Sequence, residues 1–231
     1  MKSSTPCLPW RLSVALFFSC LVFLAPASAT PQEAVTVPFE ITGRTMGPIA
    51  YKVVIADHPK TVSPVELQER VADVLENVNQ LMSTYQPDSD VSRFNRSKSV
   101  EFQPVDPKTA AVVARSIEIS KQTEGAFDIT VGPAVNLWDF GPTKSGFKIP
   151  SDAQMDAVKA LIGYQYLEVQ IEPPAIRKLV AGIQIDLSAI AKGYAVDQVA
   201  AALDQLGCGN FLVEVGGEVL ARGQRFAGGK W

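Results

Sequence analysis

One segment of the sequence places an acid and a lysine around the expected start of a helix, a pattern suited to binding phosphate. In residues 185–197 a strand is expected to end at Asp186 and a helix to begin within a few residues. The first turn of a helix presents unpaired N–H groups and the positive end of its dipole. Lys192, expected in that turn, adds a positive charge. Asp186 and the backbone carbonyl of Ala189 are hard oxygen donors, suited to a ribityl or ribose hydroxyl or to Mg²⁺.

The same segment has a purely structural interpretation, because acids are common where a strand leads into a helix. Asp186 would then cap the helix, and Lys192 would be a solvated helix residue. Composition and spacing leave both interpretations open.

A second candidate group lies in residues 82–95, where an aromatic side chain follows a helix end and a polar loop comes next. Tyr85 is suited to stacking on a flat heteroaromatic ring, although a lone tyrosine is more often a core or rim residue. Two weaker candidates are the triplet Ala126-Phe127-Asp128 and the loop around Met46. Phe127 would serve equally well as a core residue, and Met46 as a gap filler.

Other catalytic templates find little support in the sequence. His58 is the only histidine, and no cysteine or acid motif surrounds it, which argues against a zinc site or a histidine-based triad. No phosphate-binding glycine loop occurs, because Gly216-Gly217 lacks the spacing and the following helix that such loops require.

Helices and strands that could position these residues follow from periodicity and capping. Ser63-Pro64-Val65-Glu66 has the spacing of a capping box and opens a long amphipathic helix over 64–83, whereas polar sequence follows over 84–104. Further helices are expected from Asp106-Pro107 to Gly125, from Ser151, and over 190–206. Strands are expected on either side of residues 43–48, over 166–171, 176–180 and 183–187, and in a hairpin of 211–215 with 218–221. The mixture lacks a βαβ rhythm, which favours an α+β fold with mixed sheets and packed helices.

The first 29 residues are predicted to be a secretory signal peptide. Lys2 and Arg11 precede an apolar run, and Ala27 and Ala29 supply the small residues that signal peptidase requires. A lipoprotein signal would need small residues just before Cys20, and Phe17-Phe18-Ser19 stands there instead, which argues against lipid attachment. The mature part, residues 30–231, is therefore expected in the periplasm as one enzyme domain.

Charge and cysteine content narrow the partners of this mature part. The whole chain has a net charge of −3, and removing the leader takes away two positive charges and no acid, which disfavours nucleic acid as a partner. Cys208 is the only cysteine after the leader, so no internal disulfide is expected, and it is interpreted as a small turn residue.

Taken in order, these segments resemble the ApbE family of flavin transferases, which are FAD:protein FMN transferases. The resemblance rests on Thr45-Met46-Gly47 and on residues 82–95, 126–138, 185–197 and 213–218. It implies an FAD site lined by seven residues, of which the last two are also catalytic, and a Mg²⁺ ligand at the carbonyl of Ala189. The seven are Met46, Tyr85, Ala126, Phe127, Asp128, Asp186 and Lys192.

The resemblance also implies a reaction and its partners. FMN would pass from FAD to a threonine or serine of an acceptor protein with release of AMP, in a Mg²⁺-dependent protein flavinylation. The acceptors would be flavoprotein subunits of sodium-translocating NADH:quinone reductases or Rnf-type complexes, through which the enzyme would associate with the inner membrane. Two alternatives stay open: Mg²⁺-dependent hydrolysis of FAD to FMN and AMP, and flavin binding without catalysis.

Family members are longer than this chain, which stops at Trp231. The resemblance therefore implies a C-terminally truncated ApbE-like fold that lacks a Mg²⁺-binding segment and a histidine motif. On this basis the 231-residue chain is expected to transfer FMN poorly, and a longer chain to restore the activity.

Overall fold

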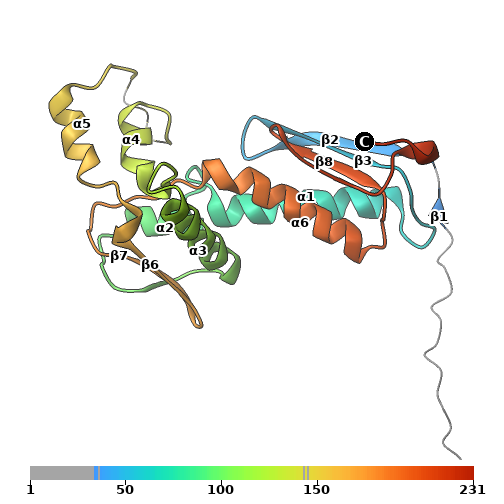
Figure 1. The fold of residues 1–231 in the computed structure, drawn as a ribbon, viewed down its shortest axis with the longest axis horizontal. Helices are drawn as coiled ribbons and strands as arrows, with labels where there is room; N and C mark the ends of the chain where they lie inside the picture. The colour runs from blue at the N-terminus through green and yellow to red at the C-terminus, as the bar shows by residue number, and fades with distance from the viewer. Residues whose placement is uncertain (1–33, 36, 143, 145) are drawn as a thin grey trace, which may run out of the picture. The chain divides into compact units, whose positions relative to one another are not determined.

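The fold was analysed in a computed structural model that describes residues 34–231, apart from 36, 143 and 145 (Figure 1). The predicted signal peptide, residues 1–29, lies outside the described residues. Within the described part, antiparallel sheets and packed helices confirm the predicted α+β class.

The main sheet has four antiparallel strands in the order β2-β3-β8-β9. They are β2 (Phe39–Thr45), β3 (Ile49–Ile55), β8 (Phe211–Val215) and β9 (Glu218–Arg222). In β8, Phe211, Val213 and Val215 are buried at alternate positions, because successive side chains of a strand point to opposite faces. The predicted hairpin turn at Gly216-Gly217 is present, with positive φ at both residues, a conformation open to glycine at little steric cost.

Two long helices, α1 (Pro64–Met82) and α6 (Ser188–Gln205), pack against each other and against strands of this sheet. Both were predicted. Their small and branched apolar side chains supply much of the core. The C-terminal end of α1 lies near the N-terminal end of α6 (Figure 1). The junction of the two helix ends is thereby held by packing along both helices.

The start of α1 offers a test of the capping prediction. The Ser63 hydroxyl accepts a hydrogen bond from the Glu66 N–H at 3.1 Å, as the capping spacing predicts. Removing this acceptor should lower the free energy of unfolding by about 1 kcal/mol in Ser63→Ala. Urea denaturation followed by circular dichroism measures the change, with Ser99→Ala as the exposed control. Equal stability of Ser63→Ala and the wild type would show that the cap contributes nothing.

A second group of elements surrounds a three-stranded antiparallel sheet of order β5-β7-β6. Helix α3 (Pro107–Gln122) contacts its strands β6 and β7 and is capped by Asp106, as predicted. Helix α5 (Asp152–Lys159) begins where it was predicted, after Ser151, which forms a capping box with Gln154. The remaining elements are β1 (Ala34–Val35), β4 (His58–Pro59), β5 (Gln103–Pro104), β6 (Leu167–Ile171), β7 (Pro174–Lys178), α4 (Gly132–Leu137), α5 (Asp152–Lys159) and the 3-10 turns Ile129–Val131, Tyr164–Tyr166 and Phe226–Gly228.

Two parts of the sequence-based prediction are wrong. The polar stretch 84–104 contains a helix, α2 (Asp90–Arg96), which Ser89 caps and which buries Val91 and Phe94. With only two large apolar residues in two turns, α2 carries too weak a periodic signal to be recognised. Residues 183–187 were predicted as a strand but pair with no strand of the described sheets.

Cys208 is a buried core residue as well as a turn residue. Burial, with the nearby Asp57 and Asp204, raises the pKa of its thiol to about 11. The reactive thiolate is therefore scarce at neutral pH. None of the helices in the described part of the chain is both long and apolar enough to cross a membrane.

Candidate functional site

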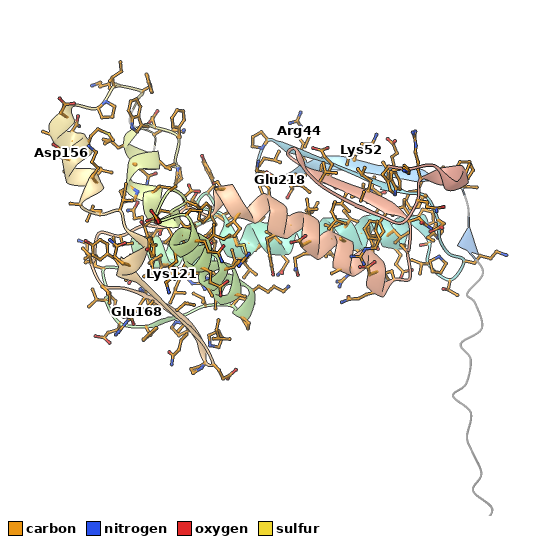
Figure 2. The ribbon with its side chains drawn as sticks, in the orientation of Figure 1. Arg44, Lys52, Lys121, Asp156, Glu168 and Glu218 are labelled. Atoms are coloured by element: carbon orange, nitrogen blue, oxygen red, sulfur yellow. The ribbon has the colours of Figure 1, made fainter. Side chains whose placement is uncertain are left out.

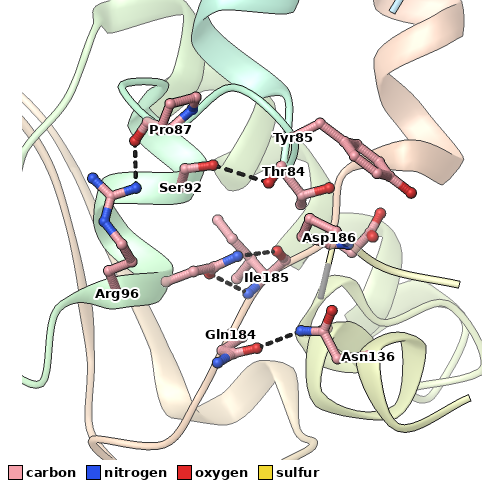
Figure 3. Close-up of a pocket in the computed structure, with 12 residues that line it drawn as sticks. Thr84, Tyr85, Pro87, Ser92, Arg96, Asn136, Gln184, Ile185 and Asp186 are labelled. Atoms are coloured by element: carbon pink, nitrogen blue, oxygen red, sulfur yellow. Dashed lines mark hydrogen bonds between the residues drawn. The ribbon is translucent and has the colours of Figure 1, made fainter. Parts of the chain in front are cut away.

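A pocket of about 300 Å³ opens where α1 ends and the segment leading into α6 passes (Figure 3). Its walls come from the loop after α1, from α2, from α4 and from residues 184–186. The lining includes Tyr85, Ser92, Asn95, Gly132, Asn136 and Asp186. Mostly polar side chains from segments far apart in the sequence thus converge on one concave site, as ligand sites do.

Asp186 is fixed at the start of α6 and faces this pocket (Figure 3). Its side chain is only 9% exposed, and Oδ1 accepts a hydrogen bond from the Ser188 N–H at 2.7 Å. Its own N–H donates to the Ile129 carbonyl at 2.8 Å. Asp186 thus accepts the N–H of the first residue of α6, although the N-cap position itself is Leu187, which makes no side-chain capping bond. Oδ2 has no hydrogen-bond partner among the described residues. One oxygen serves the helix and the other is available to a ligand.

Tyr85 forms the aromatic rim of the pocket. Its side chain is 62% exposed, and its hydroxyl donates a hydrogen bond to the Phe140 carbonyl at 2.9 Å. Because this bond fixes the ring while leaving it exposed, Tyr85 is suited to stacking on a planar ligand. The structure brings Tyr85 and Asp186 to the same pocket.

Lys192 and Met46 lie at a different place, the end of the main sheet. The Lys192 ammonium is 3.4 Å from Glu218 Oε1 on β9 and 3.4 Å from the Gly216 carbonyl. Glu218 itself lies at the end of the main sheet (Figure 2). Met46 sits in the turn between β2 and β3 with a positive φ of 48° and packs partly against the core. Neither residue lines the pocket of Tyr85 and Asp186.

The position of Lys192 in its helix also corrects the sequence-based prediction. Helix α6 begins at Ser188, so Lys192 lies in its second turn rather than the first. A position in the first turn of α6 would have placed Lys192 beside the free N–H groups of that turn. Its charge instead extends toward the hairpin turn at Gly216.

The three residues of the triplet Ala126-Phe127-Asp128 lie in different environments. Ala126 is exposed, and Phe127 packs partly on the core. Asp128 accepts three hydrogen bonds: from the Thr130 N–H at 2.8 Å, from the Thr130 hydroxyl at 2.6 Å and from the Tyr164 N–H at 2.7 Å. Both of its carboxylate oxygens are used in the fold. Asp128 is joined to the pocket indirectly, through the Ile129 carbonyl that holds Asp186.

Metal-binding groups are sparse in the described part of the chain, where no cluster of three or more His, Cys, Asp or Glu side chains occurs. Ala189 lies in the exposed first turn of α6, where its carbonyl is an oxygen donor near Asp186 in sequence. Mg²⁺ commonly takes one or two protein oxygens together with water and substrate phosphates, so this sparse set fits such an ion. His58 is buried against the Phe39 ring.

Sequence reasoning missed several polar residues of the pocket, among them Asn95, Asn136 and Gln184. The Asn95 side chain exchanges two hydrogen bonds with the backbone of Ile185, and Asn136 Nδ2 donates to Gln184 Oε1 at 2.9 Å. Asn136 Oδ1 is buried without a hydrogen-bond partner among the described residues. Asn95 and Asn136 stand in segments on which the family resemblance rests, and Gln184 directly precedes another, but nothing in their spacing distinguishes them from ordinary loop residues.

The fold is that of the solved flavin transferases. A flavin transferase of this type from Vibrio cholerae superposes with a TM-score of 0.80 at 38% identity, over 84% of this chain and 62% of the solved chain. A flavinyl transferase from Pseudomonas stutzeri in its apo form gives 0.79 at 36% identity, over 85% of this chain and 64% of that one.

Sequence comparison narrows this class to one family. The ApbE family profile matches residues 46–231. The FAD:protein FMN transferase of Haemophilus influenzae is 38% identical over 91% of this chain and 61% of its own length. That of Escherichia coli is 39% identical over 94% of this chain and 63% of its own length. The chain belongs to the ApbE family, and it spans less than two thirds of the length of these relatives.

Proposed function

We propose that the chain forms part of a flavin transferase that moves FMN from FAD to a threonine or serine of an acceptor protein. The pocket shared by Tyr85 and Asp186 carries this proposal, because it joins an exposed ring to a free carboxylate oxygen at a helix start. The buried, unpartnered Asn136 Oδ1 adds an acceptor that a ligand N–H group would satisfy. The names of the relatives favour the same activity.

Each predicted residue has a role in this proposal. The Tyr85 ring stacks on the flat heterocycle of the ligand, and Asp186 Oδ2 accepts a hydrogen bond from a ribityl or ribose hydroxyl. The opening turn of α6 faces phosphate oxygens, and Lys192 offsets their charge from the next turn. Met46, Ala126, Phe127 and Asp128 shape or support the site, as the family resemblance implies.

The proposed reaction is a phosphoryl transfer. The acceptor hydroxyl attacks the phosphorus of the FMN half of FAD, the bond to the bridging pyrophosphate oxygen breaks, AMP leaves and the hydroxyl proton is released. Mg²⁺, held by the Ala189 carbonyl and Asp186, would supply neutralisation of the pyrophosphate charge. Positioning and charge compensation are the main contributions of such enzymes, and the nucleophile is the acceptor's own hydroxyl.

Acceptor and location form part of the same proposal. The acceptor would be a flavoprotein subunit of a membrane electron-transfer complex, of the sodium-translocating NADH:quinone reductase or Rnf type. The reaction would take place in the periplasm, to which the predicted signal peptide directs the chain.

The activity is tested by incubating FAD, Mg²⁺ and an acceptor domain with the 231-residue chain and, in parallel, with a chain extended to the length of its relatives. We expect covalent, fluorescent flavin on the acceptor and an equal amount of AMP with the extended chain, and the labelling by the 231-residue chain measures what this segment does by itself. Denaturing gel fluorescence and liquid chromatography measure the two products. Free FMN and AMP without labelled acceptor would instead establish FAD hydrolysis. FAD left unchanged by the extended chain would contradict both activities.

A further inference from the structure

The segment that carries Asp186 belongs to none of the described sheets, and side chains supply much of the hydrogen bonding that holds it. Residues 183–187 belong to no described strand, yet Ile183, Ile185 and Leu187 are buried. Buried backbone groups require hydrogen-bond partners, so side chains have to supply what a neighbouring strand would supply.

Asn95, at the end of α2, provides the first partner. Its Oδ1 accepts the Ile185 N–H at 2.8 Å, and its Nδ2 donates to the Ile185 carbonyl at 2.8 Å. One amide side chain thereby makes both bonds that a strand residue would make with Ile185. A side-chain amide carries an acceptor and a donor group at the spacing of a backbone N–H and C=O. A carboxylate lacks the donor, and an aliphatic side chain lacks both.

Lys178, at the end of β7, provides the second partner. Its side chain is 0% exposed, and its ammonium donates to the carbonyls of Phe94 at 2.8 Å, Ser97 at 3.0 Å and Ile183 at 2.8 Å. The three protons of the ammonium therefore match three backbone acceptors. Lys178 also lies over the Phe94 ring, with the nitrogen 4.3 Å from its centroid.

Burial of this lysine is costly, which indicates that its contacts matter. Desolvation lowers the pKa of the Lys178 ammonium to about 8, and no carboxylate pairs with it among the described residues. An apolar residue would fill the same space without that cost, but it would leave the three carbonyls without donors. The lysine joins the C-terminal end of α2 to the segment that leads into Asp186.

We propose that Asn95 and Lys178 are positioning residues, which lock the backbone of residues 183–187 so that the Asp186 carboxylate faces the pocket. The inference rests on the proposed flavin-binding function of that pocket. Neither side chain is assigned a contact with the reacting atoms. Asn95 acts one residue before Asp186, through Ile185, and Lys178 acts three residues before it, through Ile183.

Hydrogen–deuterium exchange tests the clamp without reference to any ligand. In Asn95→Leu and Lys178→Met, peptides covering residues 183–187 should exchange about tenfold faster, because buried bonds to this segment are lost. Peptides from the middle of α1 should keep their rates. Lys98→Met and Asn77→Leu make the same chemical changes at exposed positions and should leave residues 183–187 protected. Unchanged exchange of this segment in both clamp variants would overturn the proposal.

A double-mutant cycle tests whether the clamp acts through Asp186. FAD affinity, measured by titration calorimetry with the full chain, should fall about tenfold in Asn95→Leu. In an Asp186→Ala background the same Asn95→Leu change should cause no further loss, because the carboxylate it positions is absent. Equal losses in both backgrounds would show that Asn95 affects the fold or touches the flavin directly, and would overturn its positioning role.

Two further outcomes are distinguishable. If Asn95→Leu does not fold, Asn95→Asp replaces it, since an aspartate keeps the acceptor for the Ile185 N–H and loses only the donor. A folded wild-type chain that binds no FAD would contradict the proposed function. The hydrogen–deuterium exchange rate of residues 183–187 would then be the measurement that tests the clamp.

Discussion

Asp186→Ala should lower the affinity of the chain for FAD by about one to two decades, or roughly 1.5–3 kcal/mol, the range for a lost hydrogen bond to a charged group. The expectation follows from the pocket, in which Asp186 Oδ1 is held by the Ser188 N–H and Oδ2 is free to accept from a ligand hydroxyl. Titration calorimetry with FAD measures the loss. Asp156→Ala, an exposed acid on α5, serves as the matched control and should bind FAD like the wild type.

Asp186→Asn separates the two roles of this side chain. The amide keeps an oxygen for the Ser188 N–H, so this bond to the first residue of α6 survives while the charge is lost. A large loss of FAD affinity in the asparagine variant, with the thermal unfolding midpoint retained, would assign the effect to the ligand contact. A loss of FAD affinity seen only in Asp186→Ala would assign it to the bond between Asp186 and the Ser188 N–H.

Lys192→Ala extends the same test to the end of the main sheet. If Lys192 offsets phosphate charge, its removal should also weaken FAD binding, by less than Asp186→Ala because Glu218 already shares the lysine charge. Unchanged FAD affinity in both Asp186→Ala and Lys192→Ala would leave the two residues with purely structural roles.

Asp128→Ala should lower the free energy of unfolding by about 3 kcal/mol, a large effect for one substitution. The carboxylate accepts three hydrogen bonds, and the buried Thr130 hydroxyl that donates to it accepts the Gly163 N–H at 2.7 Å. Its removal leaves donors of Thr130 and Tyr164 without acceptors and loosens the link between residues 128–130 and 163–164. Urea denaturation of wild type and variant gives the difference.

Asp128→Asn should be intermediate in stability. The amide oxygen can still serve Thr130, whereas its NH₂ group would face the Tyr164 N–H, donor against donor. Asp156→Ala again provides the control and should unfold within about 0.5 kcal/mol of the wild type. Wild-type stability in Asp128→Ala would show that this network does not hold the fold, and would favour a role of Asp128 toward the ligand.

Local signals in the sequence were sufficient for most of the helices and strands. Ser63, Asp106 and Ser151 were predicted as helix starts and cap α1, α3 and α5, because a capping hydrogen bond joins residues only two or three positions apart. The hairpin at Gly216-Gly217 followed from two glycines between apolar runs. These features depend on neighbouring residues, so they can be predicted without knowledge of the fold.

The order of the motifs along the chain was likewise enough to recognise the family. The order of the predicted helices and strands was enough to predict the α+β class. Residue types alone did not decide whether Asp186 caps a helix or binds a ligand. The structure shows that Oδ1 accepts the Ser188 N–H and that Asp186 also lines a pocket, which the spacing of residues along the chain does not reveal.

Tertiary structure decided which candidates share a site. Tyr85 and Asp186 are 101 positions apart in the sequence and line one pocket. Lys192, only six positions from Asp186, lies outside that pocket and contacts the hairpin turn at Gly216. The hydrogen bonds between Asn95 and Ile185 span 90 positions, and those of Lys178 with Phe94 span 84. Contacts at such separations depend on how helices and sheets pack, and periodicity and capping describe only the local chain. The support of Asp186 by side chains instead of a strand therefore became visible only in the folded chain.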